Sequence, residues 1–94
     1  MMTSEAHTAH VDAANTLAAA ANVAPEEHTT EWSEKDNEGR SILQNGERTV
    51  YLETGFDGAH LIYTRDDPHR FGKTHLDHDG AVKYLRGDTP LQEL

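Results

Sequence analysis

The 94 residues fit one small domain with a modest core, so a deep core beside a large substrate cavity is not expected. The absence of cysteine excludes disulfides and thiolate metal sites. The 17 Asp and Glu against 8 Lys and Arg give a formal net charge of -9, which argues against non-specific binding to nucleic acid at ordinary salt.

This acidic excess has two physical interpretations. In the first, the protein is halophilic and works in molar salt, where the Debye length is about 3 Å and the acidic coat maintains hydration. In the second, it works at ordinary salt and the charge attracts a basic partner. The scarcity of lysine, with only three in the chain, and the abundance of Thr and Ala favour the halophilic interpretation.

The N-terminal segment lacks the basic flank and the continuous apolar run of a signal peptide. The apolar run over residues 18–21 is too short to cross a bilayer. We therefore expect a cytoplasmic protein that makes no membrane contact.

A helix is predicted over residues 5–24, where alanine and other helix formers dominate. Thr3 or Ser4 can cap its start, and Pro25 is expected to end it, because the residue before a proline disfavours helical backbone angles. Small apolar residues recur at helical spacing and form a shallow stripe suited to packing on a sheet: Val11, Ala14, Leu17, Ala18 and Ala21.

Alternation of period two from Thr29 onward predicts strands over residues 29–35, 40–44, 48–54 and 59–65. Asn45-Gly46 between the second and third strands is the preferred pair for a type I′ turn, in which both residues need positive φ. The best core candidates fall on both faces of these strands, so one face packs on the helix and the other needs its own cover. They are Ile42, Leu43, Val50, Tyr51, Leu52, Leu61, Ile62 and Tyr63.

Two structures fit residues 74–87. As a helix, the segment begins after an Asp77 or Asp79 cap and ends at Gly87. As a hairpin, it turns at Asp79-Gly80. We favour the helix.

The predicted fold class is therefore α+β: an N-terminal helix packed on an antiparallel β-meander of about four strands, followed by a short C-terminal helix, with a C-terminal β-hairpin as the alternative. One domain spans residues 1–94, and residues 1–4 and 88–94 are expected to be flexible tails.

Histidine is unusually frequent, with seven in the chain. His7 and His10 lie three residues apart on the predicted helix, a spacing at which two side chains can share a metal. The weak metal candidates near the C-terminus are His75, His78 and Asp79. No dedicated zinc spacing is present, so we interpret the histidines as polar surface residues and predict no metal or other cofactor.

No catalytic motif is visible. Ser33 and Ser41 are the only serines beyond the N-terminal segment, and neither lies in a Gly-x-Ser-x-Gly turn. Gly55-x-x-Gly58 lacks the Lys-Ser/Thr pair of a phosphate-binding P-loop. We therefore expect that the chain is not an enzyme.

The charge is unevenly distributed along the chain. Residues 1–39 have a net charge of -7, and residues 40–94 a net charge of -2. Six acids near the predicted first strand form what we call the acidic ridge: Glu26, Glu27, Glu31, Glu34, Asp36 and Glu38. Such a ridge can pair with Arg and Lys of a protein partner. An equally weighted interpretation is an edge strand that its charges protect from aggregation.

A second group, which we call the basic loop, contains Arg65, His69, Arg70, Phe71 and Lys73. Basic residues beside an aromatic ring can hold a nucleic-acid backbone and stack a base. The favoured interpretation is an ordinary loop whose Phe71 anchors into the core.

The leading functional prediction is a non-catalytic protein-binding module, such as a regulator, inhibitor or adaptor, that meets its partner through the acidic ridge. One alternative is a nucleic-acid-associated regulator that uses the basic loop. Another is a His-dependent metal-binding protein.

Overall fold

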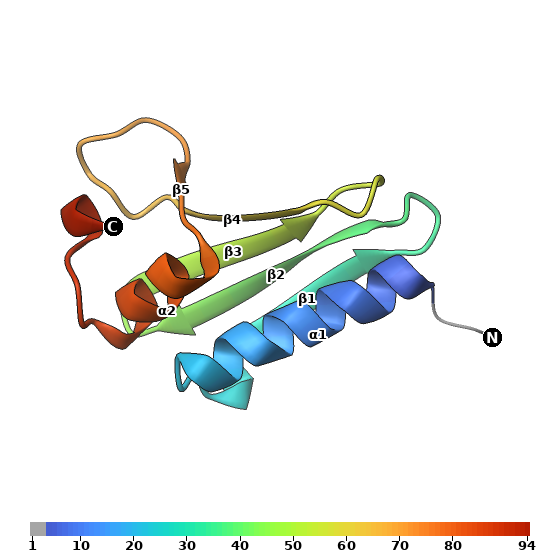
Figure 1. Cartoon of the computed structure of the whole chain (residues 1–94), viewed down its shortest axis with the longest axis horizontal. Helices are drawn as coiled ribbons and strands as arrows, with labels where there is room; N and C mark the ends of the chain where they lie inside the picture. The colour runs from blue at the N-terminus through green and yellow to red at the C-terminus, as the bar shows by residue number, and fades with distance from the viewer. Residues whose placement is uncertain (1–3) are drawn as a thin grey trace.

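The computed structural model describes residues 4–94, which form one antiparallel sheet and two helices (Figure 1). The elements in chain order are α1 (Glu5–Ala20), η1 (Pro25–Glu27), β1 (His28–Ser33), β2 (Glu38–Asn45), β3 (Arg48–Thr54), β4 (His60–Thr64), β5 (Thr74–His75), α2 (His78–Arg86) and η2 (Leu91–Glu93). The predicted α+β class is confirmed, with a fifth, two-residue strand at residues 74–75 that the favoured prediction of about four strands did not include.

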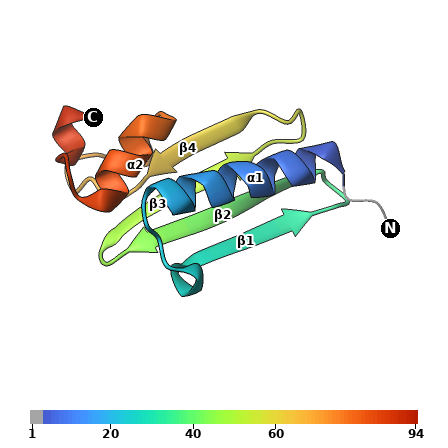
Figure 2. The same cartoon turned by 60° about the horizontal axis from the view of Figure 1, so that its bottom comes forward.

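The sheet is a simple meander in the order β1-β2-β3-β4-β5, and every neighbouring pair is antiparallel. Both helices pack on the same face: α1 contacts β1, β2 and β3, whereas α2 contacts β2, β3 and β4 (Figure 2). No element of residues 4–94 covers the opposite face of β1, β2 and β3. Among these residues, no helix is long and apolar enough to cross a membrane.

Helix α1 begins where predicted but ends earlier. The Ser4 hydroxyl accepts a hydrogen bond from the His7 amide at 3.1 Å and caps the first turn, while Thr3 lies outside the described residues. The helix ends at Ala20 rather than at residue 24, because Asn22 adopts a positive φ of 57°. The Val23 amide then donates to the Ala18 carbonyl at 2.9 Å, which completes a Schellman cap before Pro25 is reached.

The turn between β2 and β3 differs from the prediction. Asn45 pairs with Arg48 in the ladder, so the two-residue loop is Gly46-Glu47. Gly46 has a φ of 65°, whereas Asn45 and Glu47 do not have positive φ, which fits a type II′ turn rather than a type I′ turn. Asn45 has a tertiary role instead, because its Nδ2 donates to the Leu85 carbonyl at 2.6 Å.

The C-terminal segment is the favoured helix, and the hairpin alternative is wrong. The Asp77 carboxylate accepts a hydrogen bond from the Gly80 amide at 2.6 Å, and Gly87 ends α2 with a φ of 79°. The Tyr84 hydroxyl donates to Asp66 at 2.5 Å and ties α2 to the end of β4. Burial and this hydrogen bond raise the pKa of Tyr84 to about 12.

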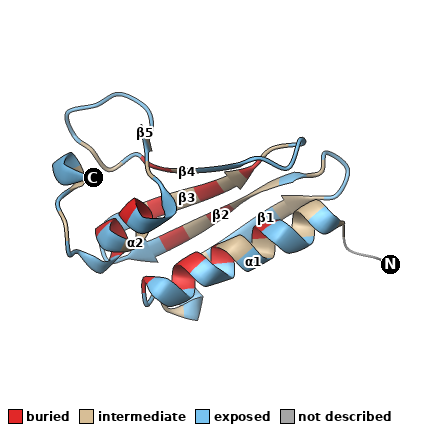
Figure 3. Ribbon diagram, in the orientation of Figure 1, coloured by how far each residue is buried: buried red, intermediate tan, exposed pale blue. Residues whose placement is uncertain are grey.

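The core lies between the helices and the inner face of the sheet (Figure 3). Its members from the sheet and α2 include Leu43, Val50, Leu52, Ala81 and Leu85, and buried positions alternate along β3. Four predicted core residues are buried, namely Leu43, Val50, Leu52 and Tyr63, whereas Leu61 is exposed. Residues 88–94 include η2, and Leu91 packs against the core.

Candidate functional site

The sheet face opposite the helices, here called the open face, is the candidate site. Successive residues of a strand point to opposite faces of the sheet. The open face therefore presents every second residue of β1, β2, β3 and β4, and the residues between them point to the core. Across the strands, Glu31 pairs with Arg40 and Arg40 with Glu53. Two residues further along the strands, Ile42 pairs with Tyr51 and Tyr51 with Tyr63. The face is thus a row of charges beside a row of apolar and aromatic side chains.

A stacked tyrosine pair lies at the centre of the aromatic row. The rings of Tyr51 and Tyr63 are 5.0 Å apart at an interplanar angle of 15°. Tyr63 donates its hydroxyl hydrogen to Glu53 at 2.6 Å, and burial together with this bond raises the pKa of Tyr63. The pair is therefore held rigidly by the protein itself.

Three cations surround these rings. The Lys73 ammonium lies 4.5 Å from the centre of the Tyr63 ring, and the Arg65 guanidinium carbon lies 5.7 Å from it. The Arg40 guanidinium carbon lies 5.6 Å from the Tyr51 ring. Such cation–π contacts are each worth about 0.5–1 kcal/mol at exposed positions. The stems of these side chains also cover the aromatic row, so Tyr63 is fully buried although no helix lies over it.

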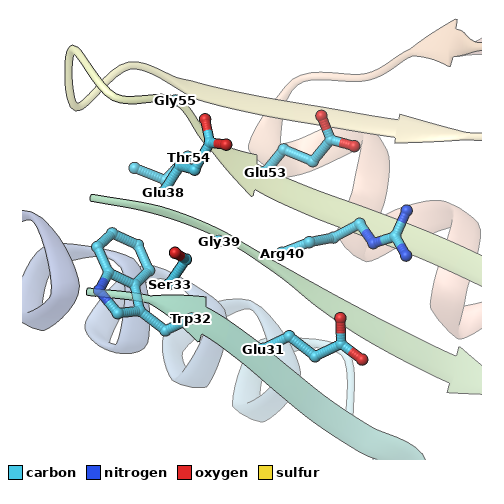
Figure 4. A pocket seen from close by; sticks show the side chains of 9 residues that line it. All are labelled: Glu31, Trp32, Ser33, Glu38, Gly39, Arg40, Glu53, Thr54 and Gly55. Carbon is cyan, nitrogen blue, oxygen red and sulfur yellow. The ribbon is translucent and has the colours of Figure 1, made fainter. Parts of the chain in front are cut away.

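A groove opens at the charged end of the same face (Figure 4). Its volume is about 560 Å³, and Gly39 and Gly55 contribute to its wall. The side chains of Glu31, Arg40 and Glu53 extend side by side from three neighbouring strands, as Figure 4 shows. Three carboxylates line the groove, those of Glu31, Glu38 and Glu53, and only one cation does. The groove therefore has an acidic excess, but the charges are interleaved: Arg40 lies between Glu31 and Glu53, and Glu53 lies 3.9 Å from the Lys73 ammonium.

The acidic ridge does not form one surface. All six acids are exposed, and they are distributed before, within and after the edge strand β1. Their side chains therefore lie in different parts of the molecule. Glu26 and Glu27 lie in η1 before the strand, while Glu34 contacts the His7 ring nitrogen at 3.0 Å at the start of α1. Asp36 accepts a hydrogen bond from the Ser33 hydroxyl at 3.1 Å within the β1–β2 turn. Only Glu31 and Glu38 of the ridge line the groove.

The basic loop is also divided. Arg65 and Lys73 lie over the tyrosine pair and belong to the open face. His69 and Arg70 line a second pocket with Lys73, near β5 and η2. Phe71 is fully exposed, so the expectation that it anchors into the core is wrong. The loop of residues 66–73 is held by an internal contact between Arg70 Nε and an Asp67 carboxylate oxygen at 3.3 Å. The Phe71 ring points into solvent.

The weak metal candidates are not brought together as a ligand set. His75 lies in β5, and His78 and Asp79 begin α2, with 3.9 Å between His78 Nδ1 and an Asp79 oxygen. Within residues 4–94, no three His, Asp or Glu side chains are grouped as a metal site requires.

The helix-covered face contains a buried hydrogen-bond network around His10 that was not predicted from the sequence. His10 is fully buried, with Nδ1 at 2.7 Å from the Thr54 hydroxyl and Nε2 at 2.8 Å from the Ser41 hydroxyl. Ser41 also contacts Thr30 at 2.6 Å, and Thr54 contacts His60 Nδ1 at 2.7 Å. We call these five residues the His10 network. It crosses the sheet from β1 to β4 and satisfies both nitrogens of a neutral imidazole.

Burial lowers the pKa of His10, and the nearby imidazoles of His60, His7 and His28 lower it further. Ser41 and His10 have the spacing of a nucleophile and its base, but both are fully buried, so no substrate can reach them in this conformation. The arrangement is suited to holding α1 in register on the sheet. The expectation that the histidines are surface residues is therefore wrong for His10.

Sequence signals for these features exist. His10 is four residues before Ala14 and seven before Leu17, so it lies on the predicted apolar stripe of α1. Arg40 lies two residues before Ile42, on the same side of its strand, but was not singled out beside the acids. The small residue Gly39 was a further signal, because a side chain there would meet the Trp32 ring within 2.5 Å.

Comparison with protein-family models, with curated proteins and with solved structures found no match to this chain. The functional argument therefore depends on the geometry of the open face.

Proposed function

We propose that the chain is a non-catalytic protein-binding module whose open face holds an extended segment of a partner protein. The partner segment places a Lys or Arg side chain in the groove and an Asp or Glu side chain near Arg65 and Lys73. The observation that carries this proposal is the charged groove on one uncovered sheet face, where three carboxylates and Arg40 lie beside a tyrosine pair flanked by cations.

The composition of the open face supports a protein partner. Tyrosine and arginine are enriched at the centres of protein interfaces, where they provide large contact areas at low cost in conformational entropy. Of the stacked pair, Tyr51 is partly exposed and can contact a partner, whereas Tyr63 is fully buried and supports Tyr51 from beside it through the stacking contact. A face held in one conformation before binding loses less entropy when a partner docks.

The charge pattern argues against a single-stranded nucleic acid as the occupant. A nucleic-acid backbone carries negative charge along its whole length, whereas Glu31, Glu38 and Glu53 occupy one end of this face. A polypeptide can present both signs of charge within a few residues. Complementary charges of this kind mainly raise the association rate and select the correct partner.

The halophilic interpretation is compatible with this role and is part of the proposal. In molar salt the screening length is short, so only charges in direct contact contribute to recognition. The groove supplies such contacts because its three carboxylates surround a cavity of about 560 Å³. The remaining acids of the ridge then serve mainly hydration.

The test uses a displayed library of short random peptides, selected against the immobilised protein in molar KCl. We expect the selected peptides to contain a basic and an acidic residue separated by a short extended spacer. Two variants then probe the two ends of the open face: Glu31→Gln with Glu38→Gln, and Arg65→Gln with Lys73→Gln. Each should weaken peptide binding by about tenfold or more, because each removes two charged partners.

Matched controls carry the same change of charge elsewhere. Glu26→Gln with Glu27→Gln lies in η1, and Lys83→Gln with Arg86→Gln lies on α2, both away from the open face. These controls should bind like the parent protein. Equal losses in test and control variants would mean that total charge, not the open face, determines binding. A loss only in the Arg65 and Lys73 variant, combined with selection of acidic peptides, would favour the nucleic-acid alternative.

A further inference from the structure

A second pocket lies beside the basic loop and is separate from the groove. Its volume is about 560 Å³, and its wall comes from the loop, from β5 and from η2. The polar part of this wall contains His69, Arg70, Lys73 and His75, and its apolar part contains Leu91 and Leu94. The pocket is thus cationic on one side and apolar on the other.

The charge of this pocket contrasts with the rest of the molecule. Arg70 and Lys73 are opposed by one lining carboxylate, that of Asp67, while the whole chain carries -9. Asp67 is already engaged, because one oxygen contacts Arg70 Nε at 3.3 Å and the other accepts the His69 amide at 2.9 Å. Arg70 has more donors than this single contact uses, since a guanidinium carries five N–H groups. Lys73 is partly engaged as well, because its Nζ lies 3.9 Å from Glu53 Oε2, so the donors left for an anion are the remaining N–H groups of Arg70 and of Lys73.

The donor set indicates the class of ligand. A guanidinium, an ammonium and two imidazoles can direct many N–H groups to one point, which suits a tetrahedral dianion better than a planar carboxylate. The cavity is larger than one phosphate group, and Leu91 with Leu94 provides contact for an uncharged body.

We infer that this second pocket binds a small organic phosphomonoester, with the phosphate against Arg70 and Lys73 and the organic part against Leu91 and Leu94. This inference does not need the proposed function, although Lys73 lies between the open face and the second pocket and contributes to both. Arg70 lines the second pocket and is not part of the open face, so its substitution tests the pocket alone.

The experiment is an NMR titration of the isotope-labelled full chain with phenyl phosphate, inorganic phosphate and phenol, at constant ionic strength set with KCl. We expect saturable amide shifts in residues 69–75 and 91–94 with phenyl phosphate. Inorganic phosphate should bind several-fold more weakly, and phenol should give no saturable shifts. Comparison of these three ligands separates the contributions of the phosphate and the organic body.

Variants then locate the site. Arg70→Gln changes a side chain that is 68 % exposed, so the fold should be retained, and it should weaken phenyl phosphate binding about tenfold. Arg70→Gln with Lys73→Gln should abolish saturable binding. The matched double variant Lys83→Gln with Arg86→Gln on α2 should bind within about twofold of the parent, since it removes the same charge elsewhere.

Three results would overturn the inference. The first is the absence of saturable shifts with phenyl phosphate, and the second is an equal loss of binding in the α2 double variant. The third is tighter binding of a single-stranded oligothymidylate to the same residues, which would assign the loop to nucleic acid. Equal affinity for inorganic phosphate and phenyl phosphate would refute the role of the apolar wall.

Discussion

The two faces of the same five-stranded sheet show how differently one set of strands can be used. On the covered face, Leu43, Val50 and Leu52 are buried, and three of the buried polar residues, His10, Ser41 and Thr54, are joined in the His10 network. On the open face, charged and aromatic residues of the same strands lie beside Thr29, Ile42 and Leu61, and no helix of residues 4–94 covers them. Most of the buried apolar residues lie on the covered face, although Tyr63 is buried on the open face, so the exposed positions of the open face are free to carry recognition chemistry.

The difference between the faces separates stability from binding. A residue on the covered face should affect unfolding strongly and binding little, whereas a charged residue on the open face should do the reverse. Each prediction below tests one side of this division.

The largest effect is expected from Leu52→Ala. Leu52 is fully buried in the core, so its truncation removes buried methyl groups and leaves a cavity, at a cost of about 2–5 kcal/mol. Leu61→Ala is the matched control, because Leu61 is 36 % exposed, and it should cost less than about 1 kcal/mol. Urea unfolding of both variants measures the difference. Similar losses would contradict the assignment of the two faces.

Gly46→Val should cost about 1–3 kcal/mol, because Gly46 has a φ of 65° that a β-branched residue strongly resists. This turn keeps β2 and β3 in register, and a slip of one residue would move every side chain to the wrong face. Glu47→Val, at the second turn position, should be much milder. Thermal unfolding of the pair measures both, and a larger loss for Glu47→Val would refute the type II′ turn.

His10→Leu should cost about 1–2 kcal/mol in unfolding free energy. The substitution leaves the Ser41 and Thr54 hydroxyls with one partner each, because Thr30 and His60 remain in contact with them. His69→Leu on the exposed loop should change stability by less than about 0.5 kcal/mol. A His10→Leu variant as stable as the parent would show that the network does not hold α1 on the sheet.

The same network predicts a dependence of stability on pH. The pKa of His10 in the folded state is lowered from 6.5, mainly by burial. Below pH 6.5 the unfolded chain therefore binds a proton that the folded chain does not, and stability falls as pH decreases toward the folded pKa, by up to about 1.4 kcal/mol per pH unit. Above pH 6.5 this group is neutral in both states and contributes no slope. His10→Leu should remove this contribution, so the variant should lose less stability than the parent as the pH is lowered from 6.5.

The smallest effect is expected on the open face itself. Glu31→Gln with Glu38→Gln should leave the unfolding free energy within about 0.5 kcal/mol of the parent, because exposed charges contribute little to folding. Any change should be stabilising at low salt, where the -9 charge repels itself, and should vanish in molar KCl. The parent should likewise melt at a higher temperature in molar KCl. A clear loss of stability in this variant would mean that these acids serve the fold.

Much of the fold follows from local patterns in the sequence. Alternation in residues 48–54 and the apolar stripe of α1 fix which residues meet in the core. The ends of helices and strands are less predictable, because each depends on the backbone conformation of one or two residues. Asn22 ends α1 before Pro25 is reached, and the ladder shifts the turn from Asn45-Gly46 to Gly46-Glu47. Strand β5 has two residues, too few for any pattern to reveal.

The candidate site was only partly predictable, because it combines residues far apart in the sequence. Glu31 and Glu38 belong to the predicted acidic ridge, and Arg65 and Lys73 to the predicted basic loop, but only strand pairing places them on one face. The sequence also contained no sign that His10 would be held by Ser41 and Thr54, since those contacts depend on how α1 lies across β2 and β3.

The most direct test of the open face as the partner surface is photo-crosslinking with a peptide selected from the displayed library. A photoreactive phenylalanine analogue replaces either Tyr51, on the open face, or Asp12, which is exposed on α1. Irradiation of each complex is followed by mass spectrometry. The proposed function predicts a peptide crosslink from position 51 and none from position 12. A crosslink from position 12 with none from position 51 would contradict it, because the partner would then contact the helices rather than the open face.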